Sequence, residues 1–414
     1  MVEARFHHYY AHAYAHRQGN RSTHLTRHGG IAASPNPNHT CTHVVQFLPP
    51  SPILPRFYAN APLQCTGATM SCGAKRKRGG QNSYRFHTLP EVLPPPLPPL
   101  PHAAPEYPLP DLTPWAQGNC GIKGVHHFES HKPGPHIAIT ALMHGNEYAG
   151  AHALTQLLST PLHPAHGRLS LIFLNLEAYA AFDPRRPSQF RFIEEDMNRL
   201  WMPHLIRSSH TSLEMRRVRE LLPVIDTVDI LLDLHTMTWP SATLLLTSMA
   251  ERNLHMASAL ANGQAAPPQV VLDHGHPTGP RLIDYERFSA PGGTARACLL
   301  EAGQHWTRSA AGQSLLSARQ TLALHGMLPV AAQEGLCPSA SCVNAMVTDC
   351  VEAYTASFAF VRPFVGGEII EQAGTIIAVD GMDEIRTPYN NCMLVIPNLR
   401  PRRGHTAVRL ARIL

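Results

Sequence analysis

Between about Asp111 and Leu328 the chain alternates short apolar runs with helical patterns, and this alternation restricts the possible fold more than any other feature. The apolar runs are HIAITAL, LSLIFLNL, VDILLDL, PQVVLD and ACLLEAG. Their length and unbroken apolar character are typical of strands that are buried on both faces of a sheet. We expect helices at SLEMRRVRELLPVI, with Ser212 as its N-cap, and at SLLSARQTLALHGML. The alternation predicts a three-layer α/β/α domain over residues 105–335.

After about Cys350 the pattern changes to short strands that are separated by glycine turns. The strands expected there are ASFAFVRPF, VGGEII, AGTIIAV, EIRTPYNNCMLVIP and AVRLARI. No helical periodicity fits this stretch of the sequence. Residues 350–414 are therefore predicted to form a small all-β domain.

Residues 1–104 differ in composition from the rest, because they are rich in His, Arg, Ser and Pro and end in LPPPLPPLPHAAP. Such a composition favours extended chain over packing, so we predict a disordered basic leader. Residues 1–90 contain one acid, Glu3, against many arginines and the run KRKR at Lys75 to Arg78. The formal net charge of +5 belongs mostly to this leader. It gives no reason to expect nucleic-acid binding by the folded part.

The leader leaves three interpretations open. Its arginines and few acids are similar to those of an organelle transit peptide, and KRKR is similar to a nuclear signal. Alternatively, translation starts later, for example at Met70, or the leader is not naturally made.

The rest of the composition points to a cytoplasmic protein without a membrane span. No run approaches the roughly 18 consecutive apolar residues that a transmembrane helix needs. The nine cysteines contain no CxxC pair. Cys337 and Cys342 could form a disulfide in an oxidising compartment, but we expect ordinary reduced thiols.

Polar residues recur where the predicted strands end, which is where open α/β sheets build their sites. The first strand leads into HGNE with His144 and Glu147, and LLDLHT ends another with Asp233 and His235. Asp233 shares a strand face with His235, so it can orient the imidazole. LLEAG ends a third strand with Glu301. Taken singly, these residues also fit a surface turn, a satisfied core histidine and a residue at the rim of a site.

Two histidines and a glutamate form the ligand set of one class of hydrolytic zinc site. In such a site, Glu301 could take a proton from the zinc-bound water and pass it to the leaving amine. The segment FRFIEEDMNRLW adds Arg191, Asp196, Asn198 and Arg199. An arginine aimed at a carbonyl oxygen stabilises an oxyanion, although this segment also fits a solvated loop.

The motifs HGNE, DMNR, DLHT and LLEAG, in this order, resemble the succinylglutamate desuccinylase and aspartoacylase family, which is related to zinc carboxypeptidases. The resemblance extends from about Asp111 to the C-terminus. It implies a zinc-carboxypeptidase-like domain with a mixed sheet, followed by a β domain similar to lipoyl-type barrels that leans over the active-site mouth.

The resemblance also implies a role for each matching residue. His144, Glu147 and His235 match the ligands of one Zn2+ per chain, and Glu301 matches the catalytic glutamate. Asn198 and Arg199 match a pair that holds a substrate carboxylate, and Arg191 matches the arginine that polarises the scissile carbonyl. Tyr389 in TPYNN matches a substrate-binding tyrosine. Candidates for two further substrate-reading positions are Tyr285, Arg287 and Arg296.

The sequence therefore predicts a zinc-dependent deacylase that hydrolyses the amide of a small N-acyl amino acid. The alternatives are a zinc carboxypeptidase or esterase acting on another small carbonyl compound, or a noncatalytic metal-binding protein. We expect a small-molecule partner and neither a nucleic acid nor a membrane. The acyl group, the amino acid and the oligomeric state stay open.

Overall fold

The computed structural model describes residues 104–186, 189–264, 266, 268–328 and 342–414. The predicted disordered leader, its KRKR run and Cys337 lie outside the described residues, apart from Ala104. The described residues all belong to one compact unit, Leu93–Leu414. No helix among them combines the length and the apolar character needed to cross a lipid bilayer.

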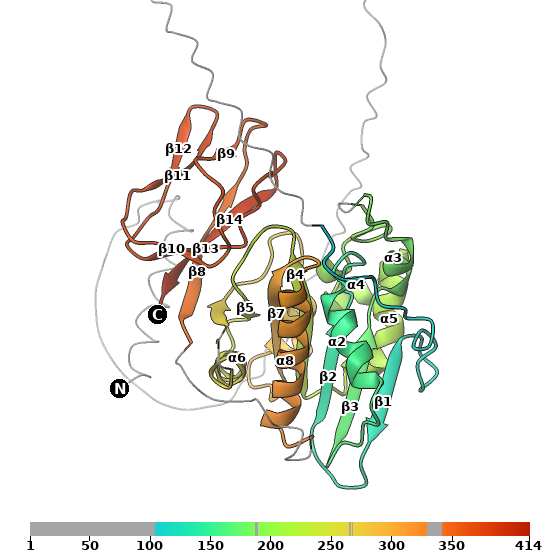
Figure 1. Ribbon diagram of the computed structural model, residues 1–414. Helices are drawn as coiled ribbons and strands as arrows, with labels where there is room; N and C mark the ends of the chain where they lie inside the picture. The colour runs from blue at the N-terminus through green and yellow to red at the C-terminus, as the bar shows by residue number, and fades with distance from the viewer. Residues whose placement is uncertain (1–103, 187–188, 265, 267, 329–341) are drawn as a thin grey trace, which may run out of the picture. The chain divides into compact units, whose positions relative to one another are not determined.

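A mixed sheet of eleven strands carries the fold, in the order β1-β3-β2-β4-β7-β5-β6-β8-β14-β13-β10 (Figure 1). The pairs β2 with β3, β2 with β4 and β4 with β7 are parallel, whereas β1 with β3 and β5 with β7 are antiparallel. The first seven strands are β1 (Val125–Glu129), β2 (His136–Ala141), β3 (Arg168–Phe173), β4 (Ile230–Met237), β5 (Leu244–Thr247), β6 (Gln269–Leu272) and β7 (Arg296–Gln304).

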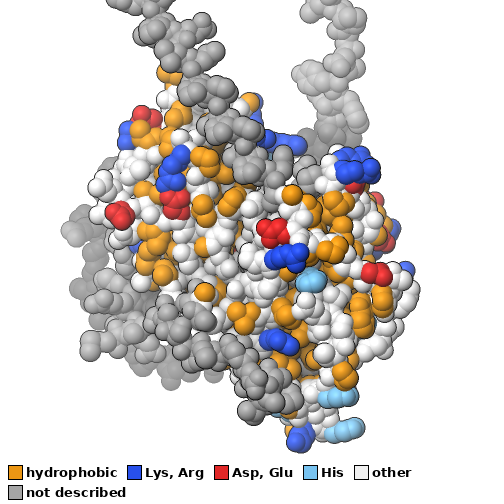
Figure 2. Space-filling model, viewed as in Figure 1, with side chains coloured by type: hydrophobic (Ala, Val, Ile, Leu, Met, Phe, Trp, Pro, Cys, Tyr) orange, Lys and Arg blue, Asp and Glu red, His pale blue; other side chains and the backbone are white. Residues whose placement is uncertain are grey.

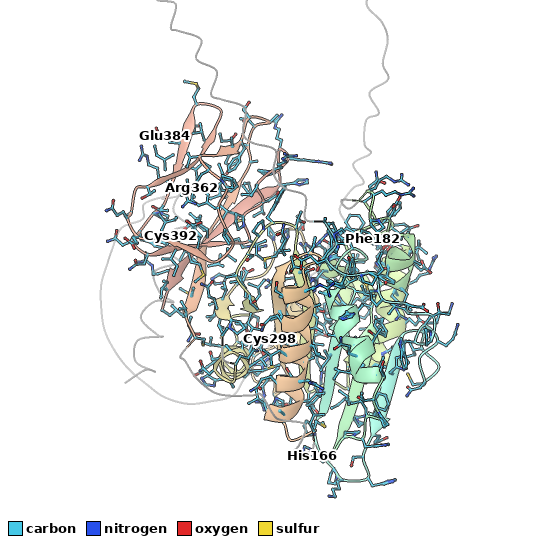
Figure 3. All side chains as sticks on the ribbon, in the orientation of Figure 1. His166, Phe182, Cys298, Arg362, Glu384 and Cys392 are labelled. Atoms are coloured by element: carbon cyan, nitrogen blue, oxygen red, sulfur yellow. The ribbon has the colours of Figure 1, made fainter. Side chains whose placement is uncertain are left out.

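Side chains alternate between two cores along the central strands, and this alternation places helices on both faces of the sheet. On β2, Ile137 and Ile139 belong to one core and Ala138 to the other. The first core is covered by α2 (Ala149–Leu158), α6 (Glu251–Asn262) and α8 (Arg308–Leu324), and the second by α5 (Leu213–Ile225) and α7 (Glu286–Ser289). The predicted three-layer arrangement is confirmed. Cys298 on β7 is buried in the first core (Figure 3).

The predicted helix after Ser212 is confirmed, and the Ser212 side chain accepts a hydrogen bond from the Met215 N–H at 2.9 Å. The other predicted helix, α8, begins earlier than expected, at Arg308, where Thr307 caps it. The remaining short helices are α3 (Leu176–Ala181), η1 (Met197–Arg199), α4 (Pro203–Ile206) and η2 (Leu282–Asp284).

The C-terminal region is all-β, as predicted, and its strands continue the main sheet through the parallel pairing of β6 with β8. Strand β8 already begins at Asn344, and the expected strand EIRTPYNNCMLVIP is divided into β12 and β13. The strands are β8 (Asn344–Glu352), β9 (Ala359–Phe360), β10 (Glu368–Ile370), β11 (Ile376–Asp380), β12 (Asp383–Arg386), β13 (Cys392–Val395) and β14 (Thr406–Ile413). Strands β12, β11 and β9 form a second sheet.

On the face shown in Figure 2, Lys and Arg side chains of the described region lie scattered among acidic and apolar ones. This face of the described region therefore presents no large basic patch.

Candidate metal centre and active site

His144, Glu147 and His235 converge in one buried group whose ligand atoms all lie within 4.8 Å of one another. His144 and Glu147 lie in the turn after β2, whereas His235 lies on β4, the parallel neighbour of β2. The Nδ1 atom of His144 lies 2.8 Å from Glu147 Oε1, and the Nδ1 atom of His235 lies 3.0 Å from Glu147 Oε2. Both imidazoles therefore present the same ring nitrogen to one carboxylate.

The other ring nitrogen of each histidine contacts a further carboxylate, which belongs to a different residue in each case. His144 Nε2 lies 3.0 Å from Asp196 Oδ1, and His235 Nε2 lies 2.9 Å from Asp233 Oδ2. The other oxygen of Asp233 accepts a hydrogen bond from the Thr140 hydroxyl at 2.7 Å. A carboxylate behind an imidazole favours the Nε2–H tautomer and leaves the Nδ1 lone pair available to a metal ion.

The donor set fits a divalent cation such as zinc. Two Nδ1 lone pairs directed at one carboxylate repel it unless a proton or a cation lies between them. Although the Nδ1 of His144 lies 2.8 Å from Glu147 Oε1, it is buried and forms no hydrogen bond of suitable geometry with the described residues. Burial opposes the charge on His235, but Asp233 and Glu147 raise the pKa of this imidazole well above its usual range. This group therefore attracts positive charge, and two histidines with a glutamate match the ligand chemistry of catalytic zinc.

Glu301 lies beside this group because β7 pairs in parallel with β4, and its register partner on β4 is His235. Its Oε2 atom is buried without a hydrogen-bond partner among the described residues. Burial raises the pKa of Glu301 to about 8, Glu147 and Asp233 act in the same direction, and His235 and Arg191 oppose them. A nearby divalent cation would lower this pKa, because it favours the charged carboxylate.

Glu301 lines a cavity of about 280 Å³ together with Glu147 and Arg191. The remaining lining residues come from the ends of β4 and β7, from the segment after β4, and from the C-terminal region. They are Thr236, Met237, Thr238, Trp239, Pro240, Ser241, His305, Ile396, Pro397 and Asn398. The cavity thus brings together Glu301, Arg191 and one member of the metal-binding group, Glu147.

Arg191 contacts the group directly, since its Nη1 donates to Glu147 Oε1 at 2.6 Å. Its Nη2 lies 3.8 Å from Asp196 Oδ2. Burial would raise the pKa of Asp196, but His144, Arg191 and Arg199 hold it well below its usual range. Asp196 is therefore a carboxylate that touches both His144 and the arginines.

The buried side chain of Glu214 fixes the segment that carries Arg191 and Asp196. It accepts hydrogen bonds from the backbone N–H groups of Ile193, Glu194 and Glu195 at 2.7, 3.2 and 3.3 Å. Glu214 also accepts a hydrogen bond from the Asn175 side chain at 3.2 Å. Helix α5 thus holds this irregular segment, which lacks a regular pattern of backbone hydrogen bonds of its own.

Strained backbone surrounds the site. Positive φ occurs at Leu142 (60°), Phe190 (61°), Trp306 (66°) and Ile396 (49°), each within two residues of His144, of Arg191 or of a residue that lines the cavity. Residues other than glycine rarely adopt this conformation, and a β-branched residue such as Ile396 is strained by it. Backbone strain of this kind clusters at functional sites, where surrounding packing maintains it.

Asn198 and Arg199, which are predicted to bind the substrate, contact residues that precede or begin η2. The side-chain oxygen of Asn198 accepts a hydrogen bond from the Leu282 N–H at 2.9 Å. Arg199 donates to the Asn198 carbonyl at 2.7 Å and to the Thr278 hydroxyl at 3.2 Å, and its Nη2 lies 3.8 Å from Asp196 Oδ2.

Comparison with known proteins identifies this architecture. The sequence model of the succinylglutamate desuccinylase/aspartoacylase catalytic domain matches residues 133–325, a range that contains every residue of the metal-binding group and Glu301. Residues 133–325 are thus similar to the catalytic domain of the succinylglutamate desuccinylase/aspartoacylase family. The family resemblance seen in the sequence is thus confirmed, and it supports a deacylase role. No curated protein sequence matches the chain.

Several solved structures share the fold. Succinylglutamate desuccinylase from Vibrio parahaemolyticus is 16% identical, with 70% of this chain and 86% of that chain covered and a TM-score of 0.53. A succinylglutamate desuccinylase/aspartoacylase from Rhodobacter sphaeroides is also 16% identical, with 70% and 88% covered and a TM-score of 0.53. The product-bound ectoine utilization protein EutE from Ruegeria pomeroyi is 16% identical, with 69% and 88% covered and a TM-score of 0.51.

Four residues that the resemblance suggested for reading the substrate make their printed contacts with residues outside the metal-binding group. The Tyr389 hydroxyl contacts Thr348 at 2.5 Å, and its ring packs under Arg412 at 3.9 Å, so its assignment as a substrate residue stays a prediction. Tyr285 donates to Asp226, and Arg287 donates to the Val228 carbonyl. Arg296 pairs with Ile230, at the opposite end of β4 from His235.

His305 is a buried residue of the cavity that the sequence patterns did not single out. Its Nδ1 contacts the Thr236 hydroxyl at 2.7 Å and its Nε2 contacts the Thr238 hydroxyl at 3.3 Å. Burial lowers the pKa of His305 to about 4, so the ring is neutral at pH 7. The signal in the sequence was present, because His305 follows Glu301 closely in EAGQHW.

Proposed function

We propose that this protein is a zinc-dependent deacylase that hydrolyses the amide bond of a small N-acyl amino acid. The observation that carries the proposal is the convergence of His144, Glu147 and His235 in one buried group, of which Glu147 lines the same cavity as Glu301. Zinc would be held by the Nδ1 atoms of the two histidines and by the Glu147 carboxylate. When bound, zinc supplies Lewis-acid chemistry, which polarises a carbonyl and lowers the pKa of water to about 7.

The protein's own residues would divide the remaining work. Glu301, as a carboxylate, accepts a proton from the attacking water and then donates it to the nitrogen of the leaving amine. Arg191 keeps donors free beyond its bond to Glu147, since 38% of its side chain is exposed, and it would stabilise negative charge on the carbonyl oxygen. Asp196 and Asp233 maintain the tautomer and the orientation of the two histidines.

Asn198 and Arg199 would hold a carboxylate of the substrate, and Tyr389 is proposed to assist substrate binding. This assignment rests on their match to the family's motifs. The small volume of the cavity supports a small substrate, because about 280 Å³ lies just below the usual range of small-molecule pockets. We further propose a catalytic domain over residues 105–335, an all-β domain over residues 350–414 and a cytoplasmic location.

Elemental analysis of the full-length chain tests the metal site. We expect one more zinc per chain in the wild type than in a His144→Ala/His235→Ala double variant. The histidines of the N-terminal leader are present in both proteins, so they cancel in this comparison. Equal zinc content in the two proteins would remove the basis of the proposed mechanism.

A Glu301→Gln variant tests the chemistry. We expect it to retain zinc but to lose activity on a panel of N-acyl amino acids by at least about a hundredfold, as for the loss of a general acid-base group. Near-normal turnover by this variant would contradict the role of Glu301. A preference of the wild type for dipeptides or esters would favour a carboxypeptidase or esterase. A zinc-loaded protein without activity on any of these compounds would favour a noncatalytic metal-binding role.

A further inference from the structure

Apolar side chains from two loops line part of the cavity that contains Glu301. The loop after β4 contributes Trp239 and Pro240, and the loop between β13 and β14 (Figure 1) contributes Ile396 and Pro397. Pro397 is buried, and the other three are half-buried. An apolar surface that comes from both the catalytic and the C-terminal regions therefore shares one cavity with the proposed proton-transfer carboxylate.

Hydrogen bonds fix the loop that bears Trp239 to the C-terminal region. The indole Nε1 of Trp239 donates to the side-chain oxygen of Asn398 at 3.1 Å. The N–H of Ala242 donates to the Gly366 carbonyl at 2.8 Å, and the N–H of Gly366 donates to the Pro240 carbonyl at 3.0 Å. A buried or half-buried indole is held in one orientation when its N–H has such a partner. The Trp239 ring is therefore a fixed part of the cavity wall.

The other part of the lining offers little to a charged group of the substrate. The hydroxyls of Thr236 and Thr238 contact the two ring nitrogens of His305 at 2.7 and 3.3 Å, and the Ser241 hydroxyl donates to a backbone carbonyl at 2.8 Å. Among the described residues that line the cavity, Arg191 is the only lysine or arginine. The proposed function assigns this guanidinium to the scissile carbonyl. A further carboxylate in the cavity would therefore be buried without a cation, which is strongly destabilising.

The acyl group is the part of the substrate that remains for this cavity. The proposed function places the carboxylate of the amino acid at Asn198 and Arg199, and neither residue lines the cavity. The volume of about 280 Å³ restricts the bound group to a short chain. We propose that the cavity binds the acyl group and that Trp239 selects an uncharged, apolar acyl group over one that ends in a carboxylate. This proposal rests on the deacylase function proposed above.

The first test compares two acyl groups of nearly the same shape on one amino acid. N-(4-methylpentanoyl)glutamate differs from N-succinylglutamate in that two methyl groups replace the two oxygens of the acyl carboxylate. With the zinc-loaded full-length chain, kcat/KM is expected to be at least about tenfold higher for the 4-methylpentanoyl compound, because its branched end is buried favourably against apolar side chains. Equal values, or a higher value for the succinyl compound, would overturn the proposal.

A Trp239→Ala variant tests the tryptophan itself. The quantity measured is the ratio of kcat/KM for N-(4-methylpentanoyl)glutamate to kcat/KM for N-acetylglutamate, whose acyl group is too short to gain much from the indole. This ratio does not depend on the fraction of folded or zinc-loaded enzyme, because both substrates meet the same preparation. We expect the ratio to fall by about tenfold in Trp239→Ala. An unchanged ratio would show that Trp239 does not select the acyl group.

Matched variants separate selection from a loss of packing. Trp239→Phe keeps an aromatic ring but lacks the N–H that Asn398 accepts, so its ratio should lie between those of the wild type and Trp239→Ala. Trp115 is half-buried and packs against the first core outside the cavity, and Trp115→Ala should leave the ratio within about twofold. Thermal unfolding checks each variant. If Trp239→Ala does not fold, Trp239→Phe decides, and an unchanged ratio there overturns the proposal.

A calorimetric titration distinguishes failure of this proposal from failure of the deacylase function. If the wild type hydrolyses none of these compounds, the affinities of the free acids 4-methylpentanoate and succinate are measured directly. Binding of 4-methylpentanoate that is about tenfold tighter than that of succinate, and that is weakened in Trp239→Ala, would support the apolar subsite without the reaction. Absence of binding by the wild type, or equal affinities for the two acids, would overturn it.

Discussion

His144 and Asp196 are joined by a 3.0 Å contact between Nε2 and Oδ1, although they lie in different loops of the chain. The contact has a counterpart at His235, whose Nε2 lies 2.9 Å from Asp233. The two carboxylates therefore orient the two imidazoles in the same way, with each Nδ1 directed at Glu147. This symmetry gives the acidic residue of the DMNR motif a position behind a histidine that lies elsewhere in the sequence.

Removing the charge behind one histidine should weaken metal binding. We expect Asp196→Asn to lower the affinity for zinc by about 10- to 100-fold, because a carboxylate that contacts the far nitrogen of a metal-binding histidine fixes its tautomer and raises its basicity. Competition with a chromogenic chelator measures this affinity. The exposed Asp383 on β12 provides the control, and Asp383→Asn should bind zinc like the wild type. Equal affinity in Asp196→Asn would contradict the orienting role.

Glu214 should position Arg191 without touching the substrate. Glu214→Gln keeps the shape but removes the charge that accepts from the three successive N–H groups of Ile193, Glu194 and Glu195. Since hydrogen bonds to a charged group contribute about 1.5–3 kcal/mol, we expect faster amide hydrogen exchange in residues 190–196 and about tenfold lower kcat/KM. Glu220→Gln, at an exposed position of the same helix, should change neither quantity. Unchanged amide hydrogen exchange in Glu214→Gln would mean that residues 190–196 keep their conformation without the charge of Glu214.

Gly145 should tolerate no side chain, because the turn that bears His144 lies against two other backbone segments. A Cβ atom at this position would lie 2.3 Å from the Ala178 carbonyl carbon and 2.7 Å from the Phe190 carbonyl oxygen. We expect Gly145→Ala to separate His144 from Asp196 and to abolish stoichiometric zinc binding or destabilise the fold by a few kcal/mol.

A second glycine provides the matched control for this substitution. Gly312 is exposed on α8, and a Cβ there meets no atom within 4 Å. Gly312→Ala should therefore stabilise the protein by up to about 1 kcal/mol, since alanine has the higher helix propensity. Differential scanning calorimetry measures both variants, and similar effects of the two would show that the close approach at Gly145 is unimportant.

Stability should fall on mild acidification because His136 is buried in its neutral form. Its ring contacts the Ser170 hydroxyl at 2.8 Å and the Thr227 hydroxyl at 3.0 Å. Burial lowers the pKa of His136 from 6.5 to about 4. The unfolded chain therefore binds a proton at higher pH than the folded protein does. The stabilisation from neutral His136 is present above pH 6.5 and is lost as the pH falls toward 4, and it amounts to about 3 kcal/mol.

The pH dependence is measured as the difference in thermal midpoint between the wild type and His136→Gln from pH 4 to 8. As the pH falls from 6.5 to 4, the thermal midpoint of the wild type should decrease more than that of His136→Gln, because the variant lacks this titrating group. His131→Gln, at an exposed position, should follow the wild type throughout. A constant difference between wild type and His136→Gln over this range would exclude His136 as the source.

The sequence by itself determined the layers of the fold and the residues at the strand ends. Runs such as HIAITAL and VDILLDL are typical of strands inside a sheet, and on such a strand Asp233 and His235 share a face because side chains alternate. These are local rules, so they could be applied without coordinates. The spacing within HGNE likewise allowed His144 and Glu147 to converge, since both belong to one turn.

Only the tertiary structure decided which distant groups meet. The pairing of Asp196 with His144, the anchoring of the Arg191 segment by Glu214 and the hydrogen bond from Trp239 to Asn398 each join residues that are separated widely in sequence. No periodicity encodes such contacts, because they depend on strand order and on loop paths that are set by packing of the whole sheet. The same reason explains Tyr389, whose match to a motif did not reveal that it packs against Thr348 and Arg412.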